Sequence, residues 1–143
     1  GIADHSKSSF QANGLDEDRL RQQLLEIREL NESFDDFRIF AGSEVDILRD
    51  GSLDFDDDLL GELDYVVASV HNALAIEEKE MTKRLRAAIE NPHVTMIGHV
   101  TNRLLLQREA SQVNLPEIIS ACAETGTIIE LNCNPWRLDM AWR

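Results

Sequence analysis

The sequence has few of the residues that stabilise small secreted domains and no segment suited to a bilayer. Only two of its 143 residues are cysteines, Cys122 and Cys133, and they form no CxxC pair. This argues against a disulfide framework and against a zinc-finger knuckle. No apolar run is long enough to span a membrane, and no basic segment followed by an apolar one marks a signal peptide. We therefore expect a cytoplasmic protein with no membrane partner.

Positive charge is also scarce. The chain carries 14 Lys and Arg against 27 Asp and Glu, a formal net charge of -13. An acidic surface disfavours unaided binding of nucleic acid, although bound divalent ions could reverse the field locally. The alternative is that the charge only keeps the surface well hydrated. A Walker loop, a GxGxxG turn and a GxSxG elbow are all missing, which removes the common nucleotide-binding and serine-hydrolase motifs.

What the sequence does contain is a series of short apolar runs, each followed by a histidine or a glutamate. The runs are residues 1–3, 38–43, 65–70 and 94–98, and the polar residues that follow are His5, Glu44, His71 and His99. Continuous apolar runs of this length are typical of strands buried on both faces, as in parallel sheets. Helical patterns lie between them, at about residues 16–33, 77–90 and 114–126, with a short helix near 59–63 and a last strand at 127–131.

This alternation predicts an α/β fold built from βα units around a mostly parallel sheet. In such folds the functional groups gather at the carboxyl ends of the strands. We therefore expect the four polar residues to meet at one edge of the sheet. His93 precedes its strand, so it should lie at the opposite edge and have no part in the site.

His5, Glu44, His71 and His99 are the predicted metal ligands. Neutral imidazole and carboxylate groups suit Mn²⁺ or Zn²⁺, with Fe²⁺ as a further candidate. A carboxylate can bridge two ions, and such sites activate water and stabilise phosphoryl displacement. The alternative for any one histidine beside a core strand is a structural hydrogen bond.

Three further candidates surround His5. Asp4 could orient a ligand imidazole as a hydrogen-bond acceptor, or it could form a turn. Ser6 and Lys7 lie in the loop above the same edge and could contact substrate. Lys7 could hold a phosphate, or it could simply be solvated.

Other candidates follow His99 and the last strand. Arg103 and Arg108 could contact a phosphate bidentately, or could pair with surface carboxylates. Glu130 and Asn132 alternate along the last predicted strand, so they share a face. They could point at the site, or they could serve structural hydrogen bonds.

Several motifs in this order resemble those of the PHP (polymerase and histidinol phosphatase) superfamily. They are Ala3-Asp4-His5-Ser6, Gly42-Ser43-Glu44-Val45-Asp46, Ala68-Ser69-Val70-His71 and Ile97-Gly98-His99. Residues 4–8 with 12–15, then 102–106, then 130–132 with 134–139, are similar to the C-terminal PHP domain of bacterial X-family DNA polymerases. The resemblance spans essentially the whole chain.

The resemblance implies a distorted seven-stranded βα barrel with two or three metal ions at the strand ends, and it implies phosphoester hydrolysis. In the X-family this is a 3′–5′ exonuclease or 3′-end-processing activity, usually with manganese, in the same parent chain as a polymerase domain. His5, Glu44, His71 and His99 match the family's ligands, and Asp4, Lys7 and Arg103 would be catalytic helpers. Ser6, Arg108 and Asn132 would contact the substrate.

The chain also departs from the family. A His-x-His motif and an Asp-x-His motif are absent, since no histidine precedes His5 or follows His99. Asn102 stands where the family usually has Gly, and Val100 where it has Pro. We therefore expect residues 1–143 to be a single domain, a partial barrel without the N- and C-terminal strands. Alone it should be nearly inactive, with open strand edges that favour self-association.

Two other functions remain open at this point. One is a small-molecule phosphatase of the histidinol phosphatase type, whose partner would be a phosphomonoester instead of DNA ends. The other is a PHP domain with a degraded site that serves a structural or interaction role.

Overall fold

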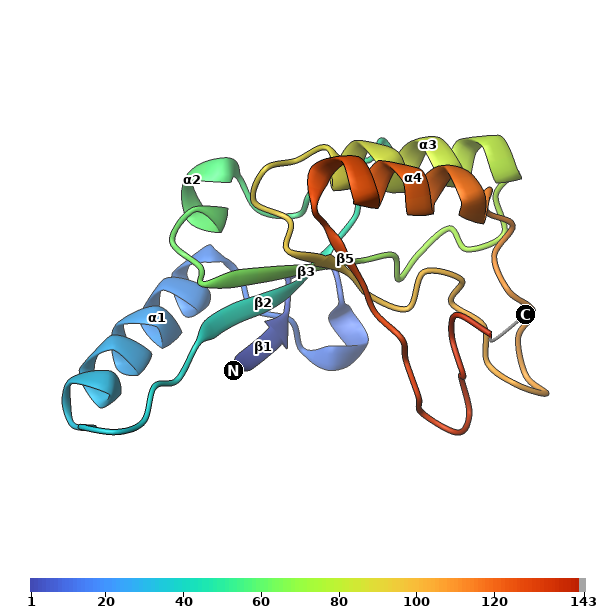
Figure 1. The fold of residues 1–143 in the computed structure, drawn as a ribbon. Coiled ribbons are helices and arrows are strands. Elements are labelled where there is room, and N and C mark those ends of the chain that lie inside the picture. The colour runs from blue at the N-terminus through green and yellow to red at the C-terminus, as the bar shows by residue number, and fades with distance from the viewer. Residues whose placement is uncertain (142–143) are drawn as a thin grey trace.

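A five-stranded parallel sheet forms the centre of the molecule. The computed structural model describes residues 1–141 and is shown in Figure 1. Its elements in chain order are β1 (Ile2–His5), the 3₁₀ turn η1 (Phe10–Ala12), α1 (Glu17–Glu32), β2 (Ala41–Asp46), α2 (Asp57–Leu60), β3 (Tyr65–Ser69), α3 (Glu78–Ile89), β4 (Met96–Ile97), α4 (Leu115–Thr125) and β5 (Ile128–Ile129). In this part of the chain, no helix is both long enough and apolar enough to cross a membrane.

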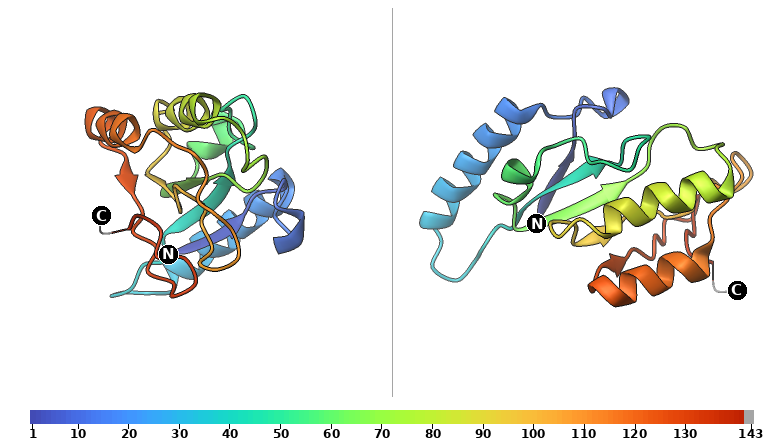
Figure 2. Two further views of the ribbon diagram at one scale, coloured as in Figure 1. Left: turned by 90° about the vertical axis from the view of Figure 1, so that its right-hand side faces the viewer. Right: turned by 90° about the horizontal axis from the view of Figure 1, so that it is seen from above.

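The strands lie in the sheet in the same order as in the chain, from β1 to β5, and every neighbouring pair is parallel. Consecutive βα units that follow one another around a sheet are the arrangement of a βα barrel. Among the described residues the sheet stays open, with β1 and β5 at its edges. Figure 2 shows α1 beside the β1 end and α4 beside the β5 end. The predicted α/β fold with a partial barrel is confirmed.

The helices begin and end at residues suited to capping. The Asp16 side chain accepts a hydrogen bond from the Arg19 amide at the start of α1, and Asn114 caps α4 in the same way. Gly126 ends α4 with a φ of 79°, a left-handed conformation that glycine adopts without strain. These helices match their expected ranges to within two residues because the capping signals are local.

The strands are shorter than expected. β2 begins at Ala41 and not near residue 38, because the Asn31 side chain takes both the N–H and the C=O of Ile39. β4 and β5 keep only two residues each. After β5 the chain leaves the ladder: the Asn132 carbonyl accepts from the Asp139 amide instead of a neighbouring strand.

The two faces of the sheet have different roles. Partnered residues in parallel strands point to the same side, so Val45, Ala68, Ile97 and Ile129 share the face that carries the core. Buried side chains of α1, α3 and α4 cover this face, among them Leu20, Leu24, Met81, Leu85 and Ile118. The other face includes His5 and its partner in the register, Glu44. The packed face thus makes a rigid support for polar groups on the opposite face.

Candidate metal centre

Glu44, in β2, lies among three imidazoles. Its Oε2 atom is 3.7 Å from Nε2 of His5, which ends β1. Its Oε1 atom is 3.2 Å from Nε2 of His71 and 3.3 Å from Nε2 of His99, which follow β3 and β4. The rings of His5 and His71 meet edge-on with centroids 4.9 Å apart, and those of His71 and His99 are 5.2 Å apart. The four residues that the sequence placed at one edge therefore form a single cluster.

Asp46 fixes the ring of His71. Its Oδ1 atom is 3.2 Å from His71 Nδ1, so both ring nitrogens of His71 face carboxylates. The Ser9 hydroxyl donates to Asp46 Oδ2 at 2.7 Å, and Ser6 Oγ accepts from the Asp46 amide at 2.9 Å. Neither Asp46 nor Ser9 was among the site residues predicted from the sequence. Asp46 could have been found, because a residue two positions after Glu44 on a strand shares its face.

The charges in this cluster are strongly coupled. Burial raises the pKa of Glu44, but hydrogen bonds from His71 and His99 outweigh it and hold that pKa well below its usual range. Burial likewise raises the pKa of Asp46, and the hydrogen bonds of His71 and Ser9 outweigh it and lower the pKa. Burial lowers the pKa of His71, but hydrogen bonds to Asp46 and Glu44 raise it overall, to about 9. One buried and one half-buried carboxylate thus favour positive charge at this position.

His99 is held through its backbone. Its amide donates to Glu130 Oε2 at 2.6 Å, and its φ of 25° is unusual for a residue with a side chain. Next along this loop, the amides of Thr101 and Asn102 donate to the buried carboxylate of Asp139 at 2.9–3.1 Å. The loop is thus held by two acidic side chains from the end of the described chain.

The donor set fits a divalent cation. Single ligand atoms of His5, Glu44 and His71 all lie within 4.8 Å of one another, and His99 Nε2 reaches the same carboxylate. Among the described residues, the buried Nδ1 atoms of His5 and His99 have no hydrogen-bond partner. Three imidazoles and a carboxylate from separate strands are the donors that Mn²⁺, Zn²⁺ and Fe²⁺ share.

The residues around His5 differ from their expected roles. Asp4 does not orient an imidazole: it points to the opposite face of the sheet, where its carboxylate accepts from Gln23 of α1 at 2.6 Å. Ser6 is fully buried against Asp46 and is not placed to touch a substrate. The Lys7 ammonium pairs with Glu17, and it lies 5.9 Å from the centre of the Phe55 ring.

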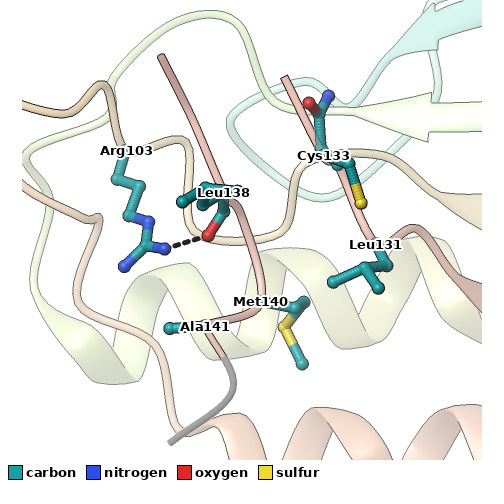
Figure 3. A pocket seen from close by; sticks show the side chains of 7 residues that line it. Arg103, Leu131, Cys133, Leu138, Met140 and Ala141 are labelled. Carbon is teal, nitrogen blue, oxygen red and sulfur yellow. Dashed lines mark hydrogen bonds between the residues drawn. The ribbon is translucent and has the colours of Figure 1, made fainter. Parts of the chain in front are cut away.

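Arg103 and Asn132 line a pocket whose lining includes none of the four residues of the Glu44 cluster. The Arg103 guanidinium donates to the carbonyl of Leu138 (Figure 3). It also donates to the carbonyl of Arg137, so both bonds direct it into the C-terminal segment. The pocket measures about 500 Å³, and its other lining residues are Leu131, Cys133, Leu138, Met140 and Ala141. Asn132 donates to Glu130 Oε1 at 3.1 Å, so it supports the residue that holds His99. It therefore acts on the cluster indirectly.

Two further predictions concern Arg108, a candidate phosphate contact, and His93, which was expected to lie outside the site. Arg108 Nε donates to the Asn102 carbonyl at 2.8 Å, and the rest of this exposed side chain borders a pocket of about 390 Å³ that Arg103 also lines. His93 lies against Gly61, which precedes β3, and so belongs to the opposite edge of the sheet as expected.

The chain is similar to a DNA-processing enzyme over nearly its whole length. It is 46% identical over 139 residues, 97% of the chain, to DNA polymerase/3'-5' exonuclease PolX of Bacillus subtilis. The predicted resemblance to X-family polymerases is confirmed. The chain is also 32% identical over 101 residues to a probable phosphatase of Clostridium acetobutylicum, and 34% identical over 99 residues to one of Syntrophotalea carbinolica, covering 68% and 66% of the chain. No family model matches it.

The chain is shorter than all three of these relatives. It spans 24% of the length of the Bacillus PolX protein and 38% of the length of each of these two phosphatases. The activities in the names of these relatives belong to longer proteins, so for this chain they are proposals.

Proposed function

We propose that the chain carries the phosphoesterase site of a metal-dependent nuclease that removes or processes nucleotides at DNA 3′ ends. The observation that carries the proposal is the cluster of three histidines around Glu44. It occurs in a sequence 46% identical to a protein whose name includes a 3'-5' exonuclease. The alternative of a degraded site has less support, since three imidazoles lie within 3.7 Å of the Glu44 carboxylate.

His5, Glu44, His71 and His99 would hold the metal. Mn²⁺ or Zn²⁺ bound there, in two or three positions in the complete domain, would polarise a phosphoryl oxygen and lower the pKa of a bound water. The protein's own part is positioning. Asp46 holds the ring orientation of His71, and Glu130 holds the backbone of His99. Neither residue would touch the substrate.

The positive groups that could meet a DNA strand lie beyond the cluster. Arg108 leaves its outer guanidinium nitrogens exposed beside the pocket that it shares with Arg103. We propose that Arg108 contacts a phosphate and that Arg103 and Lys7 support loops on the substrate side. The net charge of the chain is -13, so a polymerase region in the same protein would supply much of the DNA affinity.

The test is a nuclease assay on the protein that contains this segment. After purification without added metal, we expect bound transition metal and Mn²⁺-stimulated shortening of a 5′-labelled single strand from its 3′ end. Glu44→Gln should remove both properties, and Glu29→Gln on the exposed face of α1 should remove neither. A protein that carries no transition metal and leaves every strand intact with added Mn²⁺ would refute the proposal.

A phosphomonoesterase is the second candidate, because several relatives are named probable phosphatases. A parallel assay with small phosphomonoesters separates the two candidates. Cleavage of small monoesters with intact oligonucleotides would favour the phosphatase, whereas the nuclease should prefer oligonucleotides.

Residues 1–143 by themselves are proposed to turn over little substrate and to self-associate. The His-x-His and Asp-x-His ligand motifs are absent from these residues, and β1 and β5 are open edges in the part of the chain that the structure describes. Efficient turnover, or a strictly monomeric species in light scattering at high concentration, would contradict this pair of expectations.

A further inference from the structure

Arg84 is a buried arginine that the proposed chemistry does not use. It lies on α3 and is only 1% exposed, which is rare for a charged side chain. Within residues 1–141 it forms no ion pair with a carboxylate, and burial lowers its pKa. Burying a cation in this way is costly unless its hydrogen bonds are satisfied, so the groups that it contacts indicate its role.

The guanidinium joins two loops that follow neighbouring strands. On one side, Nε donates to the Leu48 carbonyl at 2.8 Å, and Nη2 donates to the Ile47 carbonyl. On the other side, Nη1 donates to the Asn72 carbonyl at 2.9 Å, and Nη2 donates to Asn72 Oδ1 at 3.0 Å. All of these acceptors are neutral oxygens, and three of the four are backbone carbonyls.

One loop begins directly after Asp46, the last residue of β2, and the other contains His71. Ile47 directly follows Asp46 at the end of β2, and Asn72 directly follows His71 after β3. The planar guanidinium fork presents its donors in fixed directions, so it fixes the spacing of the two loops as well as their attachment to α3. The spacing of the two loops in turn determines the distance between Asp46 Oδ1 and His71 Nδ1, which is 3.2 Å.

We propose that Arg84 is a positioning residue that holds Asp46 and His71 in register, and through them sets the affinity of the proposed metal centre. The part that concerns metal rests on the proposed function. Lysine is a flexible point charge, so it could not reproduce the fixed fork that joins all four oxygens. The proposal therefore predicts that charge alone is not sufficient at position 84.

The first measurement needs no metal. In metal-free protein with labelled histidine ring nitrogens, Arg84→Lys should shift the two His71 signals and leave those of His93 unchanged. The His71 signals are identified by their loss in His71→Ala. Arg86→Lys is the matched control, because Arg86 lies on the same helix but is exposed and paired with Glu90 at 2.9 Å. It should shift neither histidine.

The second measurement is Co²⁺ binding followed by visible absorption. Arg84→Lys should weaken binding about tenfold, the lower end of the effect of losing an outer partner of a ligand. In the His71→Ala background the same substitution should change the affinity less than twofold, because the residue through which Arg84 acts is already gone. If Arg84→Lys folds poorly, Asn72→Ala can replace it. This variant removes one acceptor of Arg84, the Asn72 side-chain oxygen, without touching the core, and it should weaken Co²⁺ binding by a smaller factor.

The outcomes separate this inference from the proposed function. Unchanged His71 signals in both Arg84→Lys and Asn72→Ala would overturn it. The inference would also be overturned if Arg84→Lys reduced Co²⁺ affinity by the same factor in the wild-type and His71→Ala backgrounds. That result would show that the substitution destabilises the fold as a whole and does not act through His71. A wild-type protein that binds no Co²⁺ would refute the proposed function, and the ring-nitrogen comparison would then decide the role of Arg84 alone.

Discussion

His71 and His99 stand at nearly equal distances from Glu44, 3.2 and 3.3 Å, but the protein positions them by different means. The His71 ring is held by a side chain, Asp46, which is itself bound by two serine hydroxyls. The His99 ring has no partner on Nδ1 among the described residues, and its backbone is held instead. The cluster therefore has two halves. In the His71 half, Asp46 orients the imidazole ring directly. In the His99 half, Glu130 holds the backbone of the loop that carries the imidazole.

The difference predicts how each half should fail. Removing the partner of His71 should change the chemistry of its ring and leave the fold intact. Removing the partners of the His99 loop should release a strained backbone, because His99 and Asn102 both have positive φ values, 25° and 56°. Damage to the His99 half should therefore appear in stability as well as in metal binding.

Glu44→Gln should have the largest effect on the site, because this residue belongs to both halves. An amide is a poor cation ligand, and it would face three imidazoles without the charge that binds them. We expect metal affinity to fall by more than about 100-fold, beyond the usual effect of losing an outer partner. Metal content after dialysis against a weak chelator measures this. Retention close to that of Glu29→Gln would show that the carboxylate is not a ligand.

Asp139→Ala should be the most damaging change outside the cluster. It leaves the amides of Thr101 and Asn102 and the Thr101 hydroxyl without their acceptor in a buried position. Buried donors without partners cost ~1–3 kcal/mol each, so we expect the free energy of unfolding to fall by about 3 kcal/mol. Urea denaturation measures this, with exposed Asp36→Asn as the control. If the two variants unfold at the same urea concentration, the loop is not held as described.

The sequence predicted the positions of the four ligands better than the side chains that hold them. The apolar runs place His5, Glu44, His71 and His99 at one edge, because each lies in or directly after such a run. The alternation of side chains along a strand also assigns Asp4 to the opposite face from His5, which the prediction of an orienting role for Asp4 overlooked. The helices were predictable because their capping residues are local signals.

The His99 half depends on contacts between distant residues, and no local pattern reveals these. Asp139 meets Thr101 across 38 positions, and Glu130 meets His99 across 31. Asn102, which stands where the family usually has glycine, has a φ of 56°. Asparagine tolerates this conformation better than most residues with a side chain. Arg103 was expected at a phosphate or a surface carboxylate. Its observed partners, the carbonyls of Arg137 and Leu138, are distant in the sequence and could not be predicted from it.

Asp46→Asn should weaken metal binding without unfolding the protein. Asparagine keeps only one acceptor oxygen, so it cannot accept from Ser9 and from the His71 ring through separate oxygens, and it carries no charge. We therefore expect a ~10–100-fold loss of affinity. Asp4→Asn is a matched control, since Asp4 lies on the adjacent strand and faces away from the site. Equal affinities in the two variants would remove the distinction between a ring-held and a backbone-held histidine.

Arg108→Ala should have the smallest effect, and it tests whether the His99 half reaches toward a strand of DNA. Loss of one phosphate contact should raise the KM for an oligonucleotide several-fold and reduce the slope of log affinity against log salt by roughly 0.7–0.9. Turnover of a small phosphomonoester should not change, because such a substrate would have no second phosphate to place there. Arg28→Ala on α1, which removes an exposed partner of Glu62, controls for net charge. If both arginine variants reduce the salt slope equally, the contribution of Arg108 is only long-range charge, and the strand does not pass over the loop that follows β4.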